Sequence, residues 1–217
     1  MAFNRDFQEI MDIIQLLETE TKNMEPPASV TLVAEYGQDP FIVLIACLLS
    51  LRTKDTISLP ASRRLFYYAH TPGAMVQLSE SQIQKLIYPV AFYRRRAHNL
   101  IAVCAMLIEQ FDGKVPQIQE ELMRLPGVGL KTANLVLSMG FSIPALCVDT
   151  HVHRISNRFG LVHTKTPEET ERALQQVVPR EYWITYCNLL VMWGQNVCKA
   201  RGQKCKQYAL ASYCHCP

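Results

Sequence analysis

The sequence predicts an all-α fold, and three observations support this prediction. Apolar residues recur at steps of three and four along most of the chain, which is the spacing of one helix face. No segment alternates apolar and polar residues between hairpin turns, as a half-buried strand does. The composition, with 217 residues of which 49% are hydrophobic and 19% charged, is typical of a folded globular protein.

The predicted helices follow from local patterns along the chain. An amphipathic helix over residues 7–17 is indicated by apolar side chains at Phe7, Ile10, Met11, Ile13, Ile14 and Leu17. Residues 41–51 are almost all apolar and predict a buried helix, since the run is well short of the roughly 20 residues that cross a membrane. Further stripes predict helices over 97–111 and 169–178, and Thr166 before Pro167 and Glu169 is typical of a helix start.

Proline and glycine separate these helices. The breaks lie at Pro26, Pro27, Pro60, Pro72, Gly73, Pro89, residues 113–116, residues 126–129, Pro144, Pro167 and Pro179. They divide the chain into about ten short helices. Because the first residues mix charge into their apolar positions and offer no cleavage site, we expect a cytoplasmic protein that is not secreted.

Charge and cysteine content narrow the function classes. A formal net charge of +3 is too small to indicate nucleic-acid binding by itself, although arginines cluster at 63–64 and 94–96. In a reducing cytosol cysteines stay as thiols. Four of the eight lie among apolar neighbours and are expected to be small buried hydrophobes: Cys47, Cys104, Cys147 and Cys187. The other four lie near the C-terminus and suggest metal ligation.

The segment 118–137 contains the most informative motif. Residues 118–125 predict a short amphipathic helix, and helical spacing resumes at Lys131. The turn between them consists of Pro126, Gly127, Val128 and Gly129. Two glycines around one apolar residue allow a sharp turn, with helix-start amides pointing outward where they can bind a phosphate. The same residues also fit an ordinary tight turn between packed helices, so both interpretations stay open.

The residues around this turn resemble the helix-hairpin-helix of the endonuclease III family of DNA glycosylases. The resemblance rests on LPGVGLKTA (125–133) and VDTHVHRISNRFGL (148–161), and extends upstream through LLSLRTKD, VAFYRRRAHNL and GKVP. It implies a six-helix lobe over residues 31–143, with the hairpin at about 118–140, and a second lobe from residues 1–30 and 144–217. It further implies that a monomer binds double-stranded DNA with a damaged base or abasic site in the cleft between the lobes.

Lys131 and Asp149 are the candidate catalytic pair. Without the family, Lys131 is interpreted as a solvated side chain and Asp149 as the N-cap of a helix that starts at Thr150. The dipole nevertheless disfavours a cation in the first turn of a helix, and so favours the neutral amine that a nucleophile needs. The resemblance implies that Lys131 attacks C1′ of the damaged nucleotide and forms a Schiff base, while Asp149 stabilises the cationic sugar.

The resemblance also assigns residues that take the base out of the duplex. Phe92 matches the family's wedge loop, and Arg52 stands where the family more often has a Gln that inserts opposite. An aromatic residue is more often buried in the core, but the arginines at 94–96 argue against burial of Phe92. Tyr93 and Arg94 follow the wedge, and the three arginines are expected to contact the DNA backbone. A guanidinium contacts a base differently from an amide, so the role of Arg52 stays open.

The last cysteines depart from the family's pattern. The family often ends in C-x6-C-x2-C-x5-C, whose four thiolates bind a [4Fe–4S] cluster. Here Cys198 and Cys205 have the first spacing, Tyr208 stands at the third position, Cys214 at the fourth, and Cys216 follows. The four cysteines hold the cluster after a local rearrangement, or hold zinc, or the metal site is lost. We expect no nucleotide cofactor.

The resulting hypothesis is a bifunctional DNA glycosylase and AP lyase of base excision repair that removes oxidised pyrimidines such as thymine glycol. Two alternatives stay open. A monofunctional glycosylase that removes uracil or mismatched thymine or adenine would hydrolyse the bond without a lysine, so Lys131 argues against it. A non-catalytic helix-hairpin-helix module would only bind bent or damaged DNA, which leaves Lys131 and Asp149 unexplained.

Overall fold

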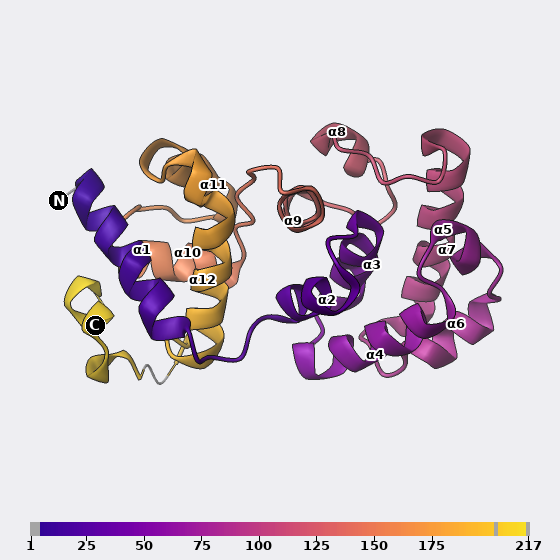
Figure 1. Cartoon of the computed structure of the whole chain (residues 1–217), viewed down its shortest axis with the longest axis horizontal. Helices are drawn as coiled ribbons and strands as arrows, with labels where there is room; N and C mark the ends of the chain where they lie inside the picture. Colours follow the sequence, from indigo (N-terminus) through magenta and orange to yellow (C-terminus); the bar gives the residue numbers. More distant parts are fainter. Residues whose placement is uncertain (1–4, 202–203, 216–217) are drawn as a thin grey trace. The chain divides into compact units, whose positions relative to one another are not determined.

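The computed structural model describes residues 5–201 and 204–215, and within these ranges the chain forms helices and no β-strand (Figure 1). The prediction of an all-α fold is therefore confirmed. The chain divides into a terminal unit, Met1–Pro27 with Pro144–Pro217, and a central unit, Ala28–Ile143. The family resemblance implies that the lobes meet between residues 30 and 31 and between residues 143 and 144. This assignment of the two lobes stays a prediction. None of the described helices is long and apolar enough to cross a membrane.

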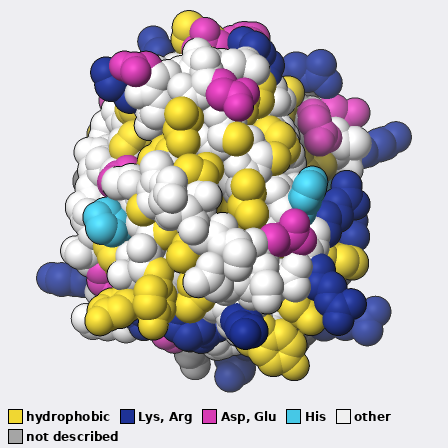
Figure 2. All heavy atoms as spheres, turned by 90° about the vertical axis from the view of Figure 1, so that its right-hand side faces the viewer, with side chains coloured by type: hydrophobic (Ala, Val, Ile, Leu, Met, Phe, Trp, Pro, Cys, Tyr) yellow, Lys and Arg dark blue, Asp and Glu magenta, His cyan; other side chains and the backbone are white. Residues whose placement is uncertain are grey.

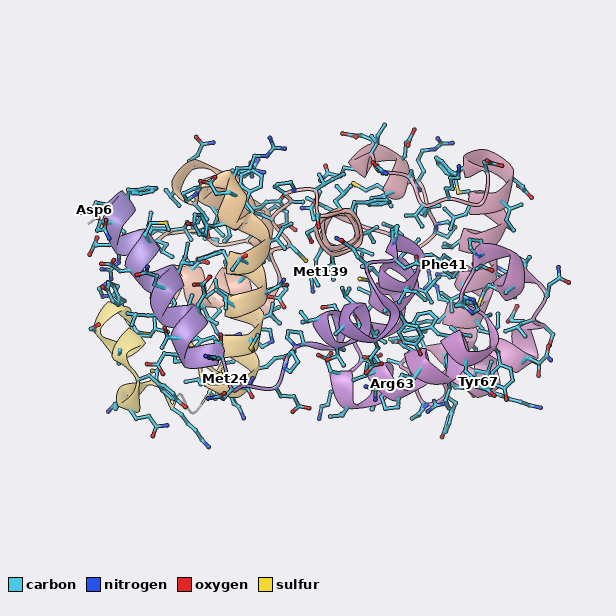
Figure 3. All side chains as sticks on the ribbon, viewed as in Figure 1. Asp6, Met24, Phe41, Arg63, Tyr67 and Met139 are labelled. Carbon is cyan, nitrogen blue, oxygen red and sulfur yellow. The ribbon has the colours of Figure 1, made fainter. Side chains whose placement is uncertain are left out.

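The central unit is organised around one buried helix. Its elements are α2 (Ala28–Tyr36), α3 (Pro40–Ser50), α4 (Asp55–Tyr68), α5 (Pro72–Val76), α6 (Glu80–Ile87), α7 (Tyr93–Phe111), α8 (Gln119–Leu122), α9 (Leu130–Leu135) and the π-helix η1 (Val136–Gly140). Every residue of α3 from Phe41 to Leu49 is buried, as the apolar run predicts. The helices α2, α4, α7, α9 and η1 pack against it. Phe41 of α3 and Met139 of η1 are labelled in Figure 3. The two helices approach closely at their ends, because a Cβ on Gly140 would lie 2.8 Å from Pro40 Cα.

The sequence predicts a break at Pro60, and this prediction is wrong because Pro60 lies inside α4. Proline cannot donate the backbone hydrogen bond of that turn. The helix persists since Ser58, Ala61 and Leu65, on either side of Pro60, are buried where α4 packs against α3 and α6. Pro60 itself is exposed, so the packing of the opposite face offsets the lost bond.

The other expected helices are present with small changes in length. α7 begins at Tyr93 rather than at residue 97, and α8 is shorter than the expected 118–125. Twelve α-helices occur in the described part of the chain, compared with the expected ten or so. The predicted helix start at Thr166 is confirmed, because its hydroxyl accepts the amide of Glu169 at 3.2 Å.

The terminal unit has a separate hydrophobic core. Its elements are α1 (Phe7–Thr21), α10 (Thr150–Arg158), α11 (Pro167–Val177), α12 (Trp183–Asn196) and the 3-10 helices η2 (Arg180–Tyr182), η3 (Cys205–Gln207) and η4 (Ala209–Tyr213). Of the predicted stripe of α1, Ile10, Ile13, Ile14 and Leu17 are buried and Met11 is partly buried. Phe7, in the first turn, is 64% exposed. Tyr186 and Trp193 of α12 complete this core.

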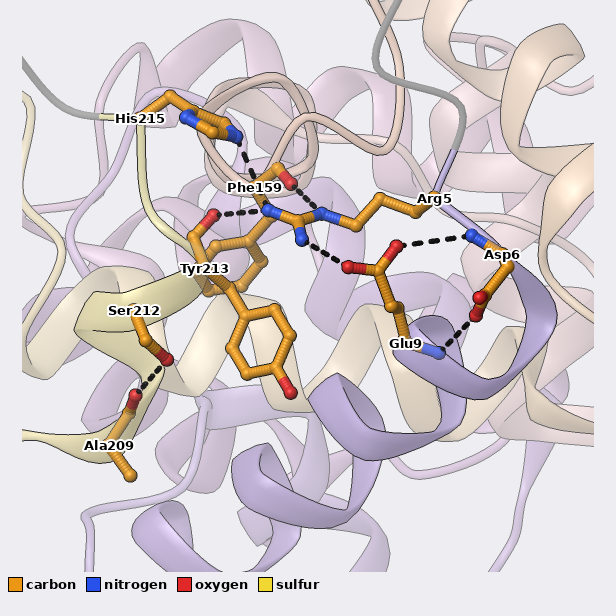
Figure 4. Close-up of polar contacts among 8 residues, drawn as sticks. All are labelled: Arg5, Asp6, Glu9, Phe159, Ala209, Ser212, Tyr213 and His215. Carbon is orange, nitrogen blue, oxygen red and sulfur yellow. Dashed lines mark hydrogen bonds and ion pairs between the residues drawn. The ribbon is translucent and has the colours of Figure 1, made fainter.

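One arginine joins three parts of the terminal unit (Figure 4). The Arg5 guanidinium donates through Nε to the carbonyl oxygen of Phe159 at 2.9 Å and through Nη2 to that of Tyr213 at 3.0 Å. Nη1 pairs with the Glu9 carboxylate at 2.8 Å, and the guanidinium lies 5.1 Å from the centroid of the Tyr213 ring. Arg5 therefore ties the C-terminal segment, defined as residues 204–215, to α1 and to the end of α10.

Replacing Arg5 by Gln should loosen this segment. The Arg5 side chain is 11% exposed, so Gln deprives two carbonyl groups of their charged donor, and we expect the free energy of unfolding to fall by about 2 kcal/mol. Urea denaturation followed by circular dichroism measures this change. Arg172→Gln is the control, because Arg172 is exposed on α11 and its loss should cost less than about 0.5 kcal/mol. Equal stability of the two variants would contradict the role of Arg5.

Candidate functional site

The hairpin between α8 and α9 is a tight turn within the central unit. The amides of Leu125 and Val128 each bond the carbonyl three residues earlier, at 3.1 Å, and Val128 is buried. Gly127 has φ +82°, a left-handed conformation that glycine adopts without strain. α9 continues directly into η1, so the hairpin opens onto one helical segment that ends at Gly140.

The two glycines of the hairpin are present for different reasons. The positive φ of Gly127 disfavours any other residue, and a Cβ there would lie 3.4 Å from Asn99 Nδ2 and 3.7 Å from Leu48 Cδ2. Gly129 has φ −104° and ψ 178°, which any residue adopts, and a Cβ there would meet no atom within 4 Å. The fold itself therefore does not require glycine at 129. A bare backbone at a helix start is what a closely approaching phosphate requires.

Lys131 is the second residue of α9 and its side chain is exposed. Gly129 is the N-cap of that helix and supplies no side-chain hydrogen bond. The first turn of α9 contains no acidic residue. Lys131 thus occupies the helix position that the sequence pattern predicts.

Asp149 is the N-cap of α10, as its structural interpretation predicts. Its Oδ1 accepts the amides of His151 and Val152, both at 2.8 Å. Within residues 5–201 and 204–215, no group donates a hydrogen bond to Oδ2. Capping therefore uses one carboxylate oxygen and fixes the orientation of the other. Asp149 belongs to the terminal unit and Lys131 to the central unit.

Arg52 and Phe92 line one pocket of the central unit. The pocket has a volume of about 430 Å³, and its walls also include Leu51, Arg95, Arg96 and Asn99. Phe92 is 64% exposed and Arg52 is also exposed, so Phe92 is not the core aromatic that its residue type alone favours. Asn99 also lies beside Gly127, which places the pocket next to the hairpin.

The three consecutive arginines do not form one surface. Arg94 is exposed, with its guanidinium 5.7 Å from the centroid of the Tyr93 ring, and Arg95 is exposed as well. Arg96 instead is half-buried and donates through Nη2 to the carbonyl oxygen of Leu51 at 2.5 Å. The expectation that all three contact the DNA backbone does not fit Arg96. Its spacing from the buried residues Leu100, Val103 and Leu107 is the signal that could have identified it as inward-facing.

On the face of the central unit that carries α5, α6 and α7, the Lys and Arg side chains of the described residues do not form a single basic patch (Figure 2). Lys and Arg side chains lie mainly towards the edges of this view, with hydrophobic and neutral side chains between them. This distribution agrees with the low net charge of +3. Recognition of a polyanion would therefore depend on local groups such as the hairpin and the pocket rather than on an overall positive field.

The four dispersed cysteines behave as the sequence predicts. All are buried: Cys47, Cys104, Cys147 and Cys187. Burial raises the pKa of the Cys104 thiol to about 12, and it raises that of Cys187 well above its ordinary value. Cys104 and Cys187 are therefore protonated thiols at neutral pH, and all four side chains serve as buried packing.

Among the described residues, the C-terminal cysteines do not form a group that could hold a metal. Cys198 and Cys205 are buried and Cys214 is partly exposed, but the described residues contain no group of three or more side chains that could hold a metal. Cys198 Sγ accepts a hydrogen bond from Arg158 at 3.1 Å. Tyr208 stands where the family has its third cysteine. Its ring packs edge to face against that of Trp193, with 5.0 Å between the ring centroids. The fourth expected ligand, Cys216, lies outside the described residues.

The known proteins that are similar to this chain have names that refer to DNA repair or to complexes with DNA. Residues 45–180 match the family model of the HhH-GPD superfamily base excision DNA repair protein. Endonuclease III of Thermotoga maritima is 44% identical over 176 residues, which cover 81% of this chain and 83% of that protein. A solved non-covalent endonuclease III–DNA complex superposes with a TM-score of 0.85 at 32% identity, covering 97% of this chain and 96% of that one. A trapped endonuclease III–DNA covalent intermediate gives a TM-score of 0.83 at 31% identity over the same shares.

Replacing Gly127 or Gly129 of the hairpin by alanine should have different effects on the stability of the fold and on DNA binding. Gly127→Ala puts a Cβ on a left-handed residue, so we expect the free energy of unfolding to fall by about 1–2 kcal/mol. Gly129→Ala should change it by less than about 0.5 kcal/mol, because the poorer N-cap is offset by the lower entropy of the unfolded chain. It should weaken binding to a duplex with an abasic-site analogue about tenfold, because the added Cβ occupies the space that a phosphate would approach. Urea denaturation and fluorescence anisotropy measure the two effects. Unchanged binding by Gly129→Ala would show that this glycine does not serve a phosphate contact.

Proposed function

The chain belongs to the HhH-GPD superfamily of base excision DNA repair proteins, and we propose that it is a bifunctional DNA glycosylase and AP lyase. Its substrate is double-stranded DNA with an oxidised pyrimidine such as thymine glycol, and it acts as a cytoplasmic monomer. The observation that carries this proposal is Lys131, an exposed amine in the first turn of α9 directly after the glycine hairpin. A similar endonuclease III was trapped as a covalent DNA intermediate, which is the chemistry that such an amine performs.

The proposed reaction begins with the neutral amine of Lys131. Nζ attacks C1′ of the damaged nucleotide, the C1′–N bond breaks, and the base leaves after gaining a proton. Loss of the amine proton and opening of the sugar ring produce a Schiff base between Nζ and C1′. Removal of a proton from C2′ then expels the 3′-phosphate and nicks the strand.

We assign Asp149 to the cationic sugar that develops as the glycosidic bond breaks. A carboxylate stabilises such a cation and can accept or return a proton. The two amide bonds to Oδ1 hold the group at the start of α10, so that Oδ2 meets the substrate in a fixed orientation. A preorganised charge of this kind needs no reorganisation during the reaction.

The hairpin and the pocket supply the contacts that expose the base. In this proposal the amides around Gly127, Val128 and Gly129 hold a backbone phosphate, which positions the protein without reading sequence. Phe92 and Arg52 fill the space that the extruded nucleotide leaves in the stack. Tyr93 and Arg94 then contact the backbone beside the wedge.

We propose that the chain does not hold the [4Fe–4S] cluster that the family resemblance implies. A [4Fe–4S] cluster would need four thiolates, namely those of Cys198, Cys205, Cys214 and Cys216. The three described members of this set do not come together in one group, and Arg158 already bonds the Cys198 sulfur. No step of the proposed mechanism passes through a metal, and a cluster would serve only to hold the C-terminal segment.

Borohydride trapping tests the proposed chemistry. Wild type incubated with borohydride and a duplex carrying one thymine glycol should form a covalent protein–DNA product, because only a Schiff base is reduced to a stable bond. Lys131→Gln should give no product. Asp149→Asn should still cap α10, since Asn is as good an N-cap as Asp, yet it should lower the rate by at least about a hundredfold.

The controls for this experiment separate the alternatives. Asp149→Ala removes both cap and charge and should also lower the free energy of unfolding by about 1 kcal/mol, so comparison with Asp149→Asn isolates the catalytic effect. Release of base by wild type without any trapped product would support a monofunctional glycosylase. Damage-specific binding without base release, unchanged in Lys131→Gln, would support a non-catalytic module.

Iron analysis tests the cofactor proposal. For protein purified without oxygen, we expect less than about one iron per chain and no absorption band near 400 nm, because the described thiols do not form a ligand set. Zinc should also be absent. About four iron atoms per chain with a visible band, both lost in Cys216→Ser, would instead establish the cluster that the family resemblance implies.

A further inference from the structure

Two loops of the central unit place non-glycine residues in the left-handed region. Arg52 follows α3 with φ +57°, and Phe92 precedes α7 with φ +57° as well. Residues with a Cβ rarely adopt this conformation, because the Cβ crowds the backbone. Since Arg52 and Phe92 line the same pocket, two strained loops present one pair of side chains.

A single guanidinium links these two loops. Arg96 donates through Nη2 to the carbonyl oxygen of Leu51 at 2.5 Å and through Nε to that of Ala91 at 3.2 Å. Leu51 and Ala91 directly precede Arg52 and Phe92, so Arg96 holds the peptide group that leads into each left-handed residue. Burial lowers the pKa of Arg96 from its ordinary value, but a guanidinium stays charged at neutral pH and both bonds are charge-assisted.

Further bonds connect the same loops. The amide of Ala91 donates to Thr53 Oγ1 at 3.2 Å, and the amide of Thr53 bonds the carbonyl of Ser50 at the end of α3 at 2.9 Å. The amide of Arg96 itself bonds the carbonyl of Phe92 at 3.0 Å. The position of Phe92 is therefore set by α3 as well as by its own helix α7.

We infer that Arg96 is a positioning residue for base extrusion, because its bonds to two carbonyls hold Arg52 and Phe92 in the conformation that enters the duplex. This inference rests on the proposed function, since it concerns the step that takes the damaged base out of the stack. The planar fork of a guanidinium bonds two acceptors at fixed angles. A lysine ammonium is a single point of charge and does not reproduce this geometry.

The test compares wild type with Arg96→Lys and Arg96→Met on two substrates. One is a duplex with thymine glycol opposite adenine, from which the base must be extruded, and the other is a single strand with a preformed abasic site, which needs no extrusion. We expect kcat/KM on the duplex to fall about tenfold or more in both variants. Lyase activity on the single strand should stay within about twofold of wild type.

Two further variants make the result decisive. Arg63→Lys is the matched control, because Arg63 on α4 (Figure 3) also bonds two oxygens through its guanidinium, those of Glu35, and lies outside the pocket. Its activity should equal that of wild type on both substrates. Thr53→Val removes the bond to Ala91 without a change of charge, and it should give the same selective loss even where an Arg96 variant fails to fold.

The possible outcomes separate this inference from the proposed function. Wild type that is inactive on both substrates would overturn the proposed function and this inference with it. Active wild type with equal losses on the two substrates would overturn the inference alone. Unchanged duplex activity, or an Arg96→Lys protein as active as wild type, would do the same.

Discussion

Burial of α3 on all sides is the constraint on which the central unit depends. Nine consecutive residues, Phe41 to Leu49, are removed from water, and each of the surrounding helices contributes the apolar face that covers them. The elements of the proposed DNA interface meet this helix. Leu48 lies beside Gly127 of the hairpin, Pro40 contacts Gly140 at the end of η1, and the chain leaves α3 directly into Arg52. A helix with no exposed face thus positions the short loops around it.

Several residues combine a structural with a proposed chemical role. Asp149 caps α10 through one oxygen, so the interpretation as a cap and the interpretation as a catalytic group describe two atoms of one side chain. The glycines of the hairpin divide the same two roles between neighbours, since the backbone requires Gly127 while Gly129 faces open space. Placing the reactive groups at helix starts provides fixed amides and a local positive field in a protein with little net charge.

Arginine side chains that bond backbone carbonyls hold both the C-terminal segment and the residues that follow α12. Arg5 bonds the carbonyl of Tyr213, Arg154 bonds that of Cys198 at 2.6 Å, and Arg158 bonds that of Lys199 at 2.9 Å. The carbonyl of Arg158 in turn accepts the amide of His215 at 2.6 Å. A planar guanidinium satisfies several acceptors at once, so these contacts provide an anchor for the segment that is independent of metal ligation.

Local patterns in the sequence by themselves determined the all-α fold, the helix start at Thr166 and the place of Lys131 in the first turn of a helix. These features depend on residues three or four apart, whose side chains share a helix face or a cap. The tertiary structure alone decided that α4 continues through Pro60, that Arg96 points inward between two loops, and that Arg5 holds the C-terminal segment. Each of these depends on partners distant in the chain, since Arg5 bonds residues 154 and 208 positions away. Such pairings arise from packing, because a guanidinium or a buried helix face is satisfied by whichever groups the fold brings to it.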